Sequence, residues 1–465
     1  MPLPVAVTCQ GLQDFVRDYE VAHPDDVCTV DREVSLDQDI TAVVWELAGR
    51  GQHPLLRFPC VKGADREVVT NLFASRVRIE RMLGARPGEL HDRYQQLAAG
   101  ATAMAELDDG PVTGRVDAGD RVDLYELPLL THFATDLGPY ITSGIVVAED
   151  AAGGRGNLSY HRSVVASRTS LGTSLHSRGD LWRLLQDAAA SGRRLPVAMV
   201  IGAHPLFMLA ASARAPFDVD EREIAGGLLG APLEVVRTPR HGLRVPASAE
   251  VVLEGEIDPA ADEDEGPFGE FSGYSSDRST RNRIDVCTVM QRADAVWVDV
   301  VGGNSQEHLN LGRVPREAEM IAKLKDRFPS VVGVHYPNSG THFHCYVAVD
   351  QRRAGEARQA LLGLLGWDPY LKTVVAVDAD VDITSDSDVL WALATHFQPA
   401  RDMMVIDGLP GSALDPSADK LGTTSRLALD ATRGPDFDAQ RIRISEAARA
   451  VGREIAADRA GELDG

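Results

Sequence analysis

A ten-residue stretch near the middle of the chain, 265–274 (EGPFGEFSGY), places two carboxylates five positions apart. Two glycines and a proline lie between Glu265 and Glu270, and this composition excludes a regular helix or a central strand. The stretch is therefore predicted to be a shaped loop that presents the two acids at a fixed separation.

Aromatic residues surround the two acids. Phe268, Phe271 and Tyr274 offer apolar cover, and a carboxylate next to apolar surface loses hydration, which favours its protonated form. A group of this kind suits a general acid at physiological pH. The alternative is a polar turn with solvated or ion-paired glutamates. The loop taken alone leaves both interpretations open.

The composition limits the partners that such a chain can have. Its 465 residues favour about three domains, and 44% hydrophobic with 25% charged residues is typical of a soluble globular protein. The net charge of -22 argues against a nucleic-acid partner or an anionic membrane surface, because either requires a basic face. A small-molecule substrate fits this charge.

Cysteine usage and the N-terminus predict a cytoplasmic location. The five cysteines are scattered without a CxxC motif, which predicts a reducing compartment with buried thiols. Met1-Pro2-Leu3-Pro4 carries no cationic segment typical of a secretory signal. The most apolar run, 195–215, is interrupted by His204 and Pro205, so a buried strand followed by a turn is favoured over a membrane span.

The pattern along the chain predicts three units. Residues 1–110 have the spacing of a mixed α/β segment. Residues 111–305 contain short β-rich runs separated by turns, including 233–236 and 295–301, and predict an antiparallel barrel or sandwich with helices at 179–190 and 220–229. Residues 306–465 form a second α/β unit with a terminal helix.

Two local expectations concern charge and proline. A helix over 72–83 has a basic face of Arg76, Arg78 and Arg81, which is interpreted as a solvated surface. Pro315 is predicted to open a helix that continues to Arg327, because proline is favoured at the first helical position.

The segment 157–162 (NLSYHR) is the second candidate element of a site. Asn157 and Arg162 would face opposite sides of a flat strand, so both reach one site only if the strand bends or Asn157 lies at its start. Arg162 is a natural partner for a carboxylate, because its planar guanidinium can bind one through two hydrogen bonds. The alternative is an ordinary arginine on a surface strand.

A metal site is possible from three separated residues. Asn157, His176 and Glu221 form an O, N, O set that suits manganese or magnesium holding a phosphate. Each also has an ordinary interpretation, as a turn Asn, a capping His and a first-turn Glu. The acids of 378–382 are not a calcium loop, and the cluster His342-Phe343-His344-Cys345 lacks a suitably spaced further ligand.

These segments together resemble the UbiD-like family of prenylated-FMN-dependent (de)carboxylases over nearly the whole chain. The resemblance is carried by strings in the family's order: 71–76 (NLFASR), 157–162 (NLSYHR), 176–178 (HSR), 202–205 (GAHP), 221–229, 246–255 (PASAEVVLEG), 265–274 (EGPFGEFSGY), 377–383, 389–392, 414–417 (LDPS) and 429–432 (LDAT). The EGPFGE-x-x-GY string with NxxxxR upstream is the most specific part.

The resemblance implies a function and a catalytic set. The chain would carry out reversible non-oxidative decarboxylation of an α,β-unsaturated or (hetero)aromatic acid with prenylated FMN, which supplies the electron sink. Arg162 would hold the substrate carboxylate, Glu265 would pair with Arg162, and Glu270 would donate the proton that replaces carbon dioxide. Two alternatives stay open, a flavin-binding carrier without decarboxylase activity and a metal-dependent hydrolase.

The resemblance also implies ligand-binding residues. The cofactor would contact Thr142, Asn157, Ser159, Tyr160, His161, Arg162, Leu175, His176, Ser212, Glu221 and Lys372. Asn157, His176 and Glu221 would bind Mn²⁺ or Mg²⁺ at the cofactor phosphate, with K⁺ nearby. Asn304 and His308 would either contact a polar substituent of the substrate or be ordinary loop residues.

The implied fold is α/β (α+β), with a flavin-reductase-like split β-barrel cofactor domain over 111–305. It is flanked by the N-terminal α/β segment and by a second α/β domain that mediates oligomerisation. A homodimer or higher homo-oligomer is expected, together with a flavin prenyltransferase that supplies the cofactor. The resemblance does not select the acid substrate.

Overall fold

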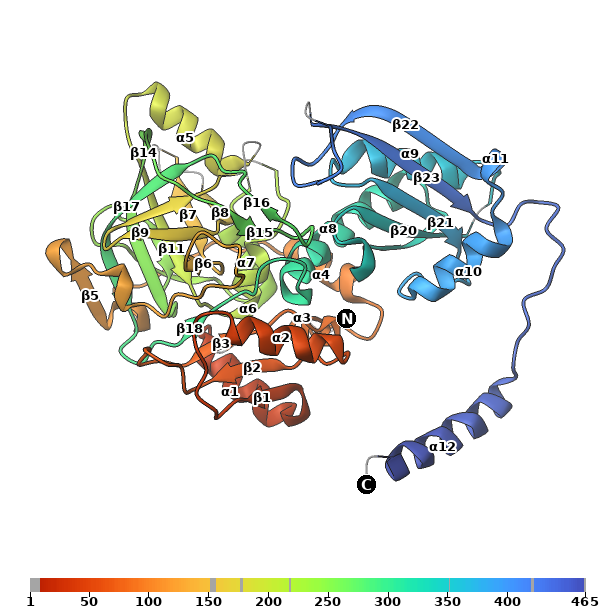
Figure 1. Ribbon diagram of the computed structural model, residues 1–465, viewed down its shortest axis with the longest axis horizontal. Coiled ribbons are helices and arrows are strands. Elements are labelled where there is room, and N and C mark those ends of the chain that lie inside the picture. The colour runs from red at the N-terminus through yellow and green to blue at the C-terminus, as the bar shows by residue number, and fades with distance from the viewer. Residues whose placement is uncertain are drawn as a thin grey trace.

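The computed structural model describes residues 9–150, 156–175, 179–216, 219–350, 352–419 and 422–463. Figure 1 shows a curled sheet, an N-terminal layer packed beneath it and a separate C-terminal sheet, with helix α8 between the two larger parts. None of the helices in these ranges combines the length and the apolar composition that a bilayer span requires.

The N-terminal layer is a small sheet with helices. Its elements are α1 (Leu12–Ala22), β1 (Val27–Thr29), α2 (Asp39–Gly49), β2 (Leu55–Phe58), β3 (Val68–Thr70), α3 (Arg76–Leu83) and α4 (Leu90–Ala98). The sheet has the order β1-β2-β3-β18, and β18 (Trp297–Val298) pairs in parallel with β3. The run at 295–301, predicted as a strand of the middle unit, therefore ties that unit to the N-terminal layer.

The prediction that α3 has a solvated basic face is wrong for Arg78. Its side chain is fully buried, and Nη2 and Nε donate to the carboxylate of Asp26 at 2.7 and 3.1 Å. The same guanidinium donates to the carbonyl oxygens of Asn71 and His53, both at 2.7 Å. These acceptors are distant in sequence, so the pattern of charge along the helix could not show that Arg78 organises the loops around it.

Arg78→Met is expected to lower the free energy of unfolding by about 3 kcal/mol, because the carbonyl groups and Asp26 would lose their buried donor. Urea unfolding followed by circular dichroism measures the change. Arg86→Met is the matched control, because Arg86 has a side chain that is 75% exposed. Equal midpoints for the two variants would contradict the structural role of Arg78.

The middle unit is a curled, antiparallel half-barrel. Its sheet has the order β6-β9-β10-β17-β14-β11-β7-β8, with β5 also paired to β17. The strands are β5 (Arg115–Ala118), β6 (Tyr140–Ile141), β7 (Ile145–Glu149), β8 (Gly156–Tyr160), β9 (Ser163–Ser167), β10 (Ser170–Thr173), β11 (Leu195–Ile201), β14 (Val251–Asp262) and β17 (Asn282–Gln291). The antiparallel β-rich unit predicted from the sequence is confirmed.

The central strands of this sheet are buried on both faces. In β11, Val197 and Met199 belong to one apolar cluster, whereas Ala198 and Val200 belong to another. Because side chains alternate across a strand, a continuous apolar run can fill two cores at once. This explains why 195–201 has the composition of a membrane segment without its length.

Helices pack against both faces of the half-barrel sheet, α5 in one apolar cluster and α6 and α7 in the other, together with a second small sheet. The helices are α5 (Asp180–Ala190), α6 (Pro205–Ala210) and α7 (Glu221–Leu229). The small sheet pairs β12 (Glu234–Arg237) with β13 (Arg244–Pro246) and β4 (Ala105–Glu106). The strand predicted at 233–236 is therefore present but lies outside the half-barrel.

The C-terminal unit is a mixed sheet flanked by helices. It contains α8 (Gln306–Arg327), β19 (Val331–His335), β20 (His344–Val349), α9 (Glu356–Trp367), β21 (Thr373–Asp378), α10 (Asp386–His396), α11 (Pro399–Asp402), β22 (Met403–Pro410), β23 (Thr423–Ala431) and α12 (Glu446–Leu463). The sheet order is β19-β20-β21-β23-β22. Helix α12 extends away from the rest of the chain (Figure 1).

Helix α8 begins earlier than predicted. Its N-cap is Ser305, whose Oγ accepts a hydrogen bond from the backbone N–H of His308 at 3.2 Å, and Pro315 lies inside the helix. A serine cap satisfies an N–H that would otherwise lack a partner, and here it fixes the start of the helix ahead of the proline. As a result, α8 starts at the end of the half-barrel and reaches the C-terminal sheet.

Candidate active site

A cavity of about 370 Å³ lies where the half-barrel, α8 and the C-terminal unit meet. This volume is within the range of small-molecule sites. The half-barrel and the loops that follow its strands contribute Thr142, Tyr160, His161, Arg162, Ser174, Leu175, Ser212, Phe268, Glu270, Phe271, Arg278, Ser279, Thr280, Val300 and Gly302. The remaining lining residues are His308, Leu311, Gly312 and Arg316 from α8, and His342, Tyr370 and Leu414 from the C-terminal unit.

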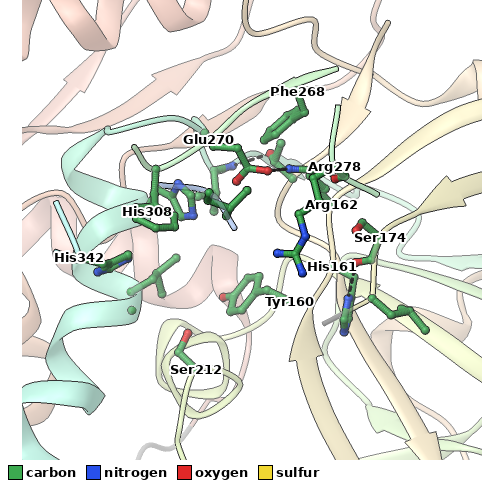
Figure 2. A pocket seen from close by; sticks show the side chains of 18 of the residues that line it. Tyr160, His161, Arg162, Ser174, Ser212, Phe268, Glu270, Arg278, His308 and His342 are labelled. Atoms are coloured by element: carbon green, nitrogen blue, oxygen red, sulfur yellow. Dashed lines mark hydrogen bonds and ion pairs between the residues drawn. The ribbon is translucent and has the colours of Figure 1, made fainter. Parts of the chain in front are cut away.

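The structure brings Arg162, Glu265 and Glu270 together. Arg162 Nε and Nη2 donate to the two carboxylate oxygens of Glu265 at 2.6 and 3.3 Å, and Nη1 donates to Glu270. Glu265 is 3% exposed and Glu270 8% exposed. Burial opposes the charge on Arg162, but Glu270 and Glu265 outweigh it and raise the pKa of Arg162 above its ordinary value. A fixed cation is therefore shared by two buried acids, and Figure 2 shows Arg162 and Glu270 at the cavity wall.

Arg162 reaches this position because β8 ends before it. The strand stops at Tyr160, and β9 starts at Ser163, so Arg162 lies in the connection between the two strands. Its side chain is therefore not restricted to one face of the sheet by the alternation of side chains along a strand. Asn157 is near the start of β8, as one of the two predicted arrangements requires. The guanidinium also lies 4.7 Å above the ring of Phe268, a contact that fixes its plane.

Residues outside the 265–274 loop hold it in place through hydrogen bonds and close packing. Phe268 and Gly269 form a short strand, β15, paired with β16 (Ser275–Ser276), and the rest of the stretch is irregular, as predicted. The N–H of Gly266 donates to the Tyr140 hydroxyl and the N–H of Gly269 to Asp136 Oδ1, both at 3.0 Å. A Cβ on Gly269 would lie 2.3 Å from the ring of Phe133, so the loop can approach that ring only with glycine here.

Several residues predicted to contact a cofactor line the cavity. They are Thr142, Tyr160, His161, Leu175 and Ser212. Ser159 lies behind them, where its hydroxyl contacts Asn157 Oδ1 at 3.1 Å and His161 Nε2 at 2.9 Å. His161 Nδ1 lies 3.1 Å from the carbonyl oxygen of Ser174. These contacts link the cavity wall to Asn157.

The structure describes two of the three predicted metal ligands, Asn157 and Glu221. Glu221 opens α7, where Asp220 is the N-cap as predicted, and Glu221 Oε2 accepts from the N–H of Leu158 at 3.0 Å, next to Asn157. Both residues are buried, whereas His176 lies outside the described residues. Loss of hydration on burial raises the pKa of Glu221 to about 7. The hydrogen bond from Leu158 lowers this pKa, but by less than burial raises it.

The chemistry of these donors fits a divalent cation. Among the described residues, no Lys or Arg forms an ion pair with Glu221. A buried carboxylate without a cation is costly, and a carboxylate with an amide oxygen is a ligand set that Mn²⁺ and Mg²⁺ accept. These donors suit one of these metals, although the described residues contain no group of three or more His, Cys, Asp or Glu side chains that could hold it.

Two predicted residues lie away from the cavity. Lys372 Nζ donates to Ser417 Oγ at 2.6 Å and pairs with Asp415 at 2.8 Å, and it is not among the lining residues. Asn304 is exposed and lines a neighbouring depression with Gly273 and Trp45. The position of Asn304 favours an ordinary loop residue over a substrate contact.

His308 does line the cavity. Its Nδ1 lies 2.7 Å from the carbonyl oxygen of Gly303, which can only accept, so Nδ1 carries a proton. Burial lowers the pKa of His308 below its ordinary value. The neutral ring leaves Nε2 as an acceptor, and Figure 2 shows the imidazole beside Glu270.

The lining residues that sequence reasoning missed include Arg316, His342 and Tyr370. His342 was considered only as a metal ligand and rejected, and β20 starts after it, at His344. Arg316 follows Pro315, which was expected at the start of the helix. Knowing that Ser305 caps α8 would have placed Arg316 on the same helix as His308, eight residues further on.

Comparison with known proteins shows the family. Models for the N-terminal, Rift-related and C-terminal domains of 3-octaprenyl-4-hydroxybenzoate carboxy-lyase (UbiD) match residues 20–98, 104–305 and 309–431. The chain is 31% identical to anhydromevalonate phosphate decarboxylase of Aeropyrum pernix, over 88% of this chain and 90% of that protein. Its counterpart in Methanosarcina mazei is 33% identical, with 86% and 92% covered.

Solved structures agree with this assignment. The UbiD-class enzyme HmfF from Pelotomaculum thermopropionicum, in complex with FMN, has a TM-score of 0.88 at 31% identity, covering 94% of this chain and 98% of that one. An evolved dimeric form of HmfF in complex with prenylated FMN has a TM-score of 0.85 at 30% identity, covering 95% and 100%. Vanillic acid decarboxylase of Sedimentibacter hydroxybenzoicus, in an open form, has a TM-score of 0.84 at 27% identity, covering 97% and 99%.

These findings confirm the resemblance that the sequence motifs indicated and the fold class that it implied. The curated relatives are decarboxylases, which disfavours the carrier and hydrolase alternatives. The chain belongs to the UbiD family of carboxy-lyases, and it is a decarboxylase.

Proposed function

We propose that this protein catalyses the reversible, non-oxidative decarboxylation of an α,β-unsaturated or (hetero)aromatic acid with prenylated FMN. The observation that carries the proposal is the pair of buried glutamates bridged by Arg162 at the wall of the cavity. Because the curated relatives are anhydromevalonate phosphate decarboxylases, anhydromevalonate phosphate is the first acid to test.

Arg162, Glu265 and Glu270 have different roles, which follow from their contacts. Glu265 binds two nitrogens of Arg162 and so fixes its orientation. The substrate carboxylate takes the place of Glu270 on Nη1, which frees the Glu270 carboxyl from Arg162 so that it can carry a proton to the substrate. When the bond to carbon dioxide breaks, Glu270 delivers this proton to the carbon and is reprotonated from solvent.

The cofactor supplies a sink for the electron pair that carbon dioxide leaves behind. Its ring system would lie against Thr142, Tyr160 and Leu175, and its phosphate would be held through a Mn²⁺ or Mg²⁺ ion on Asn157, Glu221 and His176. HmfF binds FMN or prenylated FMN, which supports this choice. A K⁺ ion near the cofactor and a contact from Lys372 stay predictions.

We also propose a homo-oligomer and a flavin prenyltransferase as the source of the cofactor. Helix α12 lies away from the rest of the chain in Figure 1, and Val451 and Ile455 on it are more than half exposed. Ile442, in the segment before the helix, is 96% exposed. Exposed apolar side chains in this position support a contact with a second copy.

The test is to express the protein together with a flavin prenyltransferase and to record its absorption spectrum and the mass of the released cofactor. A species heavier than FMN by a prenyl-derived unit, with release of carbon dioxide from an unsaturated acid, is expected. A protein that retains no flavin under these conditions would contradict the proposal.

Glu221→Gln is expected to purify with a several-fold lower ratio of cofactor to protein, because an amide is a weaker ligand for Mn²⁺ than a carboxylate. Flavin absorbance and metal analysis of the purified protein measure the change. Glu223→Gln is the control, since Glu223 lies in the same first turn of α7 and is half-buried. Full cofactor occupancy in Glu221→Gln would show that Glu221 is not a metal ligand.

A further inference from the structure

A buried pair of ionisable residues, His132 and Asp299, lies behind the cavity and has no part in the mechanism described above. Their side chains are 0% and 1% exposed, and His132 Nε2 lies 3.0 Å from both carboxylate oxygens of Asp299. The His132 ring packs edge-on against Phe268, with the ring centres 6.4 Å apart. Because Phe268 lines the cavity (Figure 2), the pair lies directly behind its wall.

The two residues form an ion pair that water does not reach. Burial opposes the charge on His132, but the negative charge of Asp299 outweighs it and raises the pKa of His132 above its ordinary value. Nε2 therefore donates to Asp299, whereas Nδ1 has no hydrogen-bond partner in the described part of the chain. A buried ion pair is often no more stable than apolar side chains of the same size, so stability alone does not explain this one.

Thr142 connects the pair to the cavity. It lies between β6 and β7 and lines the cavity, and its Oγ1 donates to Asp299 Oδ1 at 2.9 Å. The same oxygen accepts from the N–H of Val300 at 3.3 Å. A hydroxyl group has one proton and two lone pairs, so the proton and one lone pair are already used. Thr142 can therefore accept a hydrogen bond from a ligand but cannot donate one.

The carboxylate of Asp299 is held in one orientation. His132 contacts both of its oxygens, and the N–H of Asp299 donates to the carbonyl oxygen of Val69 in β3 at 3.0 Å. A hydroxyl that donates to such a carboxylate is polarised and becomes a stronger acceptor. Thr142 therefore carries an acceptor whose direction is set by the residues behind it.

We propose that Asp299, held in place by His132, is a positioning residue that fixes the Thr142 hydroxyl as the acceptor for an N–H or O–H group of the bound flavin. This inference rests on the proposed function, in which the ring system of the cofactor lies against Thr142. Asp299 acts through Thr142 and does not touch the cofactor.

The fixed hydroxyl gives the cofactor a preferred orientation. A flavin carries carbonyl oxygens and unprotonated ring nitrogens, which accept hydrogen bonds, as well as an N–H group and ribityl hydroxyls, which donate. A flavin that turned a carbonyl oxygen towards Thr142 would place two acceptors together, and each would lose its hydrogen bond. An orientation that presents a donor is therefore favoured.

The experiment measures the binding of FMN without turnover. Protein freed of cofactor is titrated with FMN in the presence of Mn²⁺, and quenching of FMN fluorescence gives Kd. Asp299→Asn keeps the shape of the side chain, but its amide N–H can donate to Thr142, which turns the hydroxyl proton towards the cavity. We expect this variant to bind FMN about 10-fold more weakly.

A double-mutant cycle separates this role from a purely structural one. Thr142→Val is expected to weaken FMN binding by about 10-fold, whereas Thr142→Ser keeps the hydroxyl and is expected to bind normally. Adding Asp299→Asn to Thr142→Val is expected to cause no further loss, because Asp299 then has no hydroxyl to orient. A structural effect of Asp299 would appear in both backgrounds.

Asp117→Asn is the matched control. Asp117 is 9% exposed, belongs to β5 of the same half-barrel and pairs with Arg115 at 2.6 Å, but it does not line the cavity. Its Kd for FMN is expected to equal that of the unmodified protein.

The inference is overturned if Asp299→Asn binds FMN as tightly as the unmodified protein, or if it weakens binding equally in the Thr142→Val background. Should Asp299→Asn fail to fold, equal binding of FMN by Thr142→Val and Thr142→Ser would overturn it instead. Unmodified protein that binds no flavin would contradict the proposed function itself, so the two failures are distinguishable.

Discussion

Glu270→Gln is expected to fold and to retain cofactor while its turnover number falls by about 10²- to 10⁴-fold, the usual contribution of a positioned proton donor. Glutamine keeps the shape of the side chain and can still contact Arg162, but it has no acidic proton to deliver. Steady-state release of carbon dioxide measures the effect, and the flavin spectrum checks that the cofactor is bound.

Glu263→Gln is the matched control for Glu270→Gln. Glu263 is two residues before the catalytic loop and is half-buried, but it does not line the cavity. It is expected to retain its turnover. Normal turnover in Glu270→Gln would remove this residue from the role of proton donor, whatever its position in the structure.

Arg162→Lys is expected to lower kcat/KM by about 10²-fold or more, although the charge is kept. An ammonium group cannot bind both oxygens of Glu265 while also facing Glu270, as the guanidinium does through Nε, Nη1 and Nη2. The substrate carboxylate would then be held by a single mobile charge. The expected result is a rise in KM together with a fall in kcat, measured on the cofactor-loaded variant.

Arg168→Lys controls for the exchange of arginine for lysine in this part of the sheet. Arg168 follows β9, its side chain is 62% exposed, and it pairs with Asp123 at the surface. Its kinetic constants are expected to match those of the unmodified protein. Equal behaviour of Arg162→Lys and Arg168→Lys would show that two-point binding at Arg162 is not required.

The local amino-acid composition was enough to predict those parts of the site whose shape depends only on the local backbone conformation. The glycines and proline of the 265–274 stretch excluded regular structure, and the structure shows a loop with a two-residue strand. The position of Arg162 was predicted as one of two alternatives, because alternation along a strand can be stated from the sequence. The strand ends at Tyr160 because its pairing with β7 ends there, at Ile145, and the alternation of side chains does not show that register.

Most of the features that sequence reasoning missed depend on partners distant in sequence, and one depends on where a helix is capped. Arg78 is buried because Asp26 and the carbonyl groups of other loops surround it. Pro315 lies inside α8 because Ser305 caps the helix further upstream. Arg316 and His342 meet only when α8 and the turn before β20 pack together, so neither residue was predicted to line the site.

The cavity is assembled from two separate parts of the chain, and this has an evolutionary consequence. Arg162, Glu265 and Glu270 all belong to the half-barrel, whereas Arg316, His342, Tyr370 and Leu414 belong to α8 and the C-terminal unit. Substitutions in the second part can therefore change which acid is accepted without disturbing the groups proposed to break the carbon–carbon bond. A lineage that keeps the first part and varies the second can acquire new substrates by gradual drift.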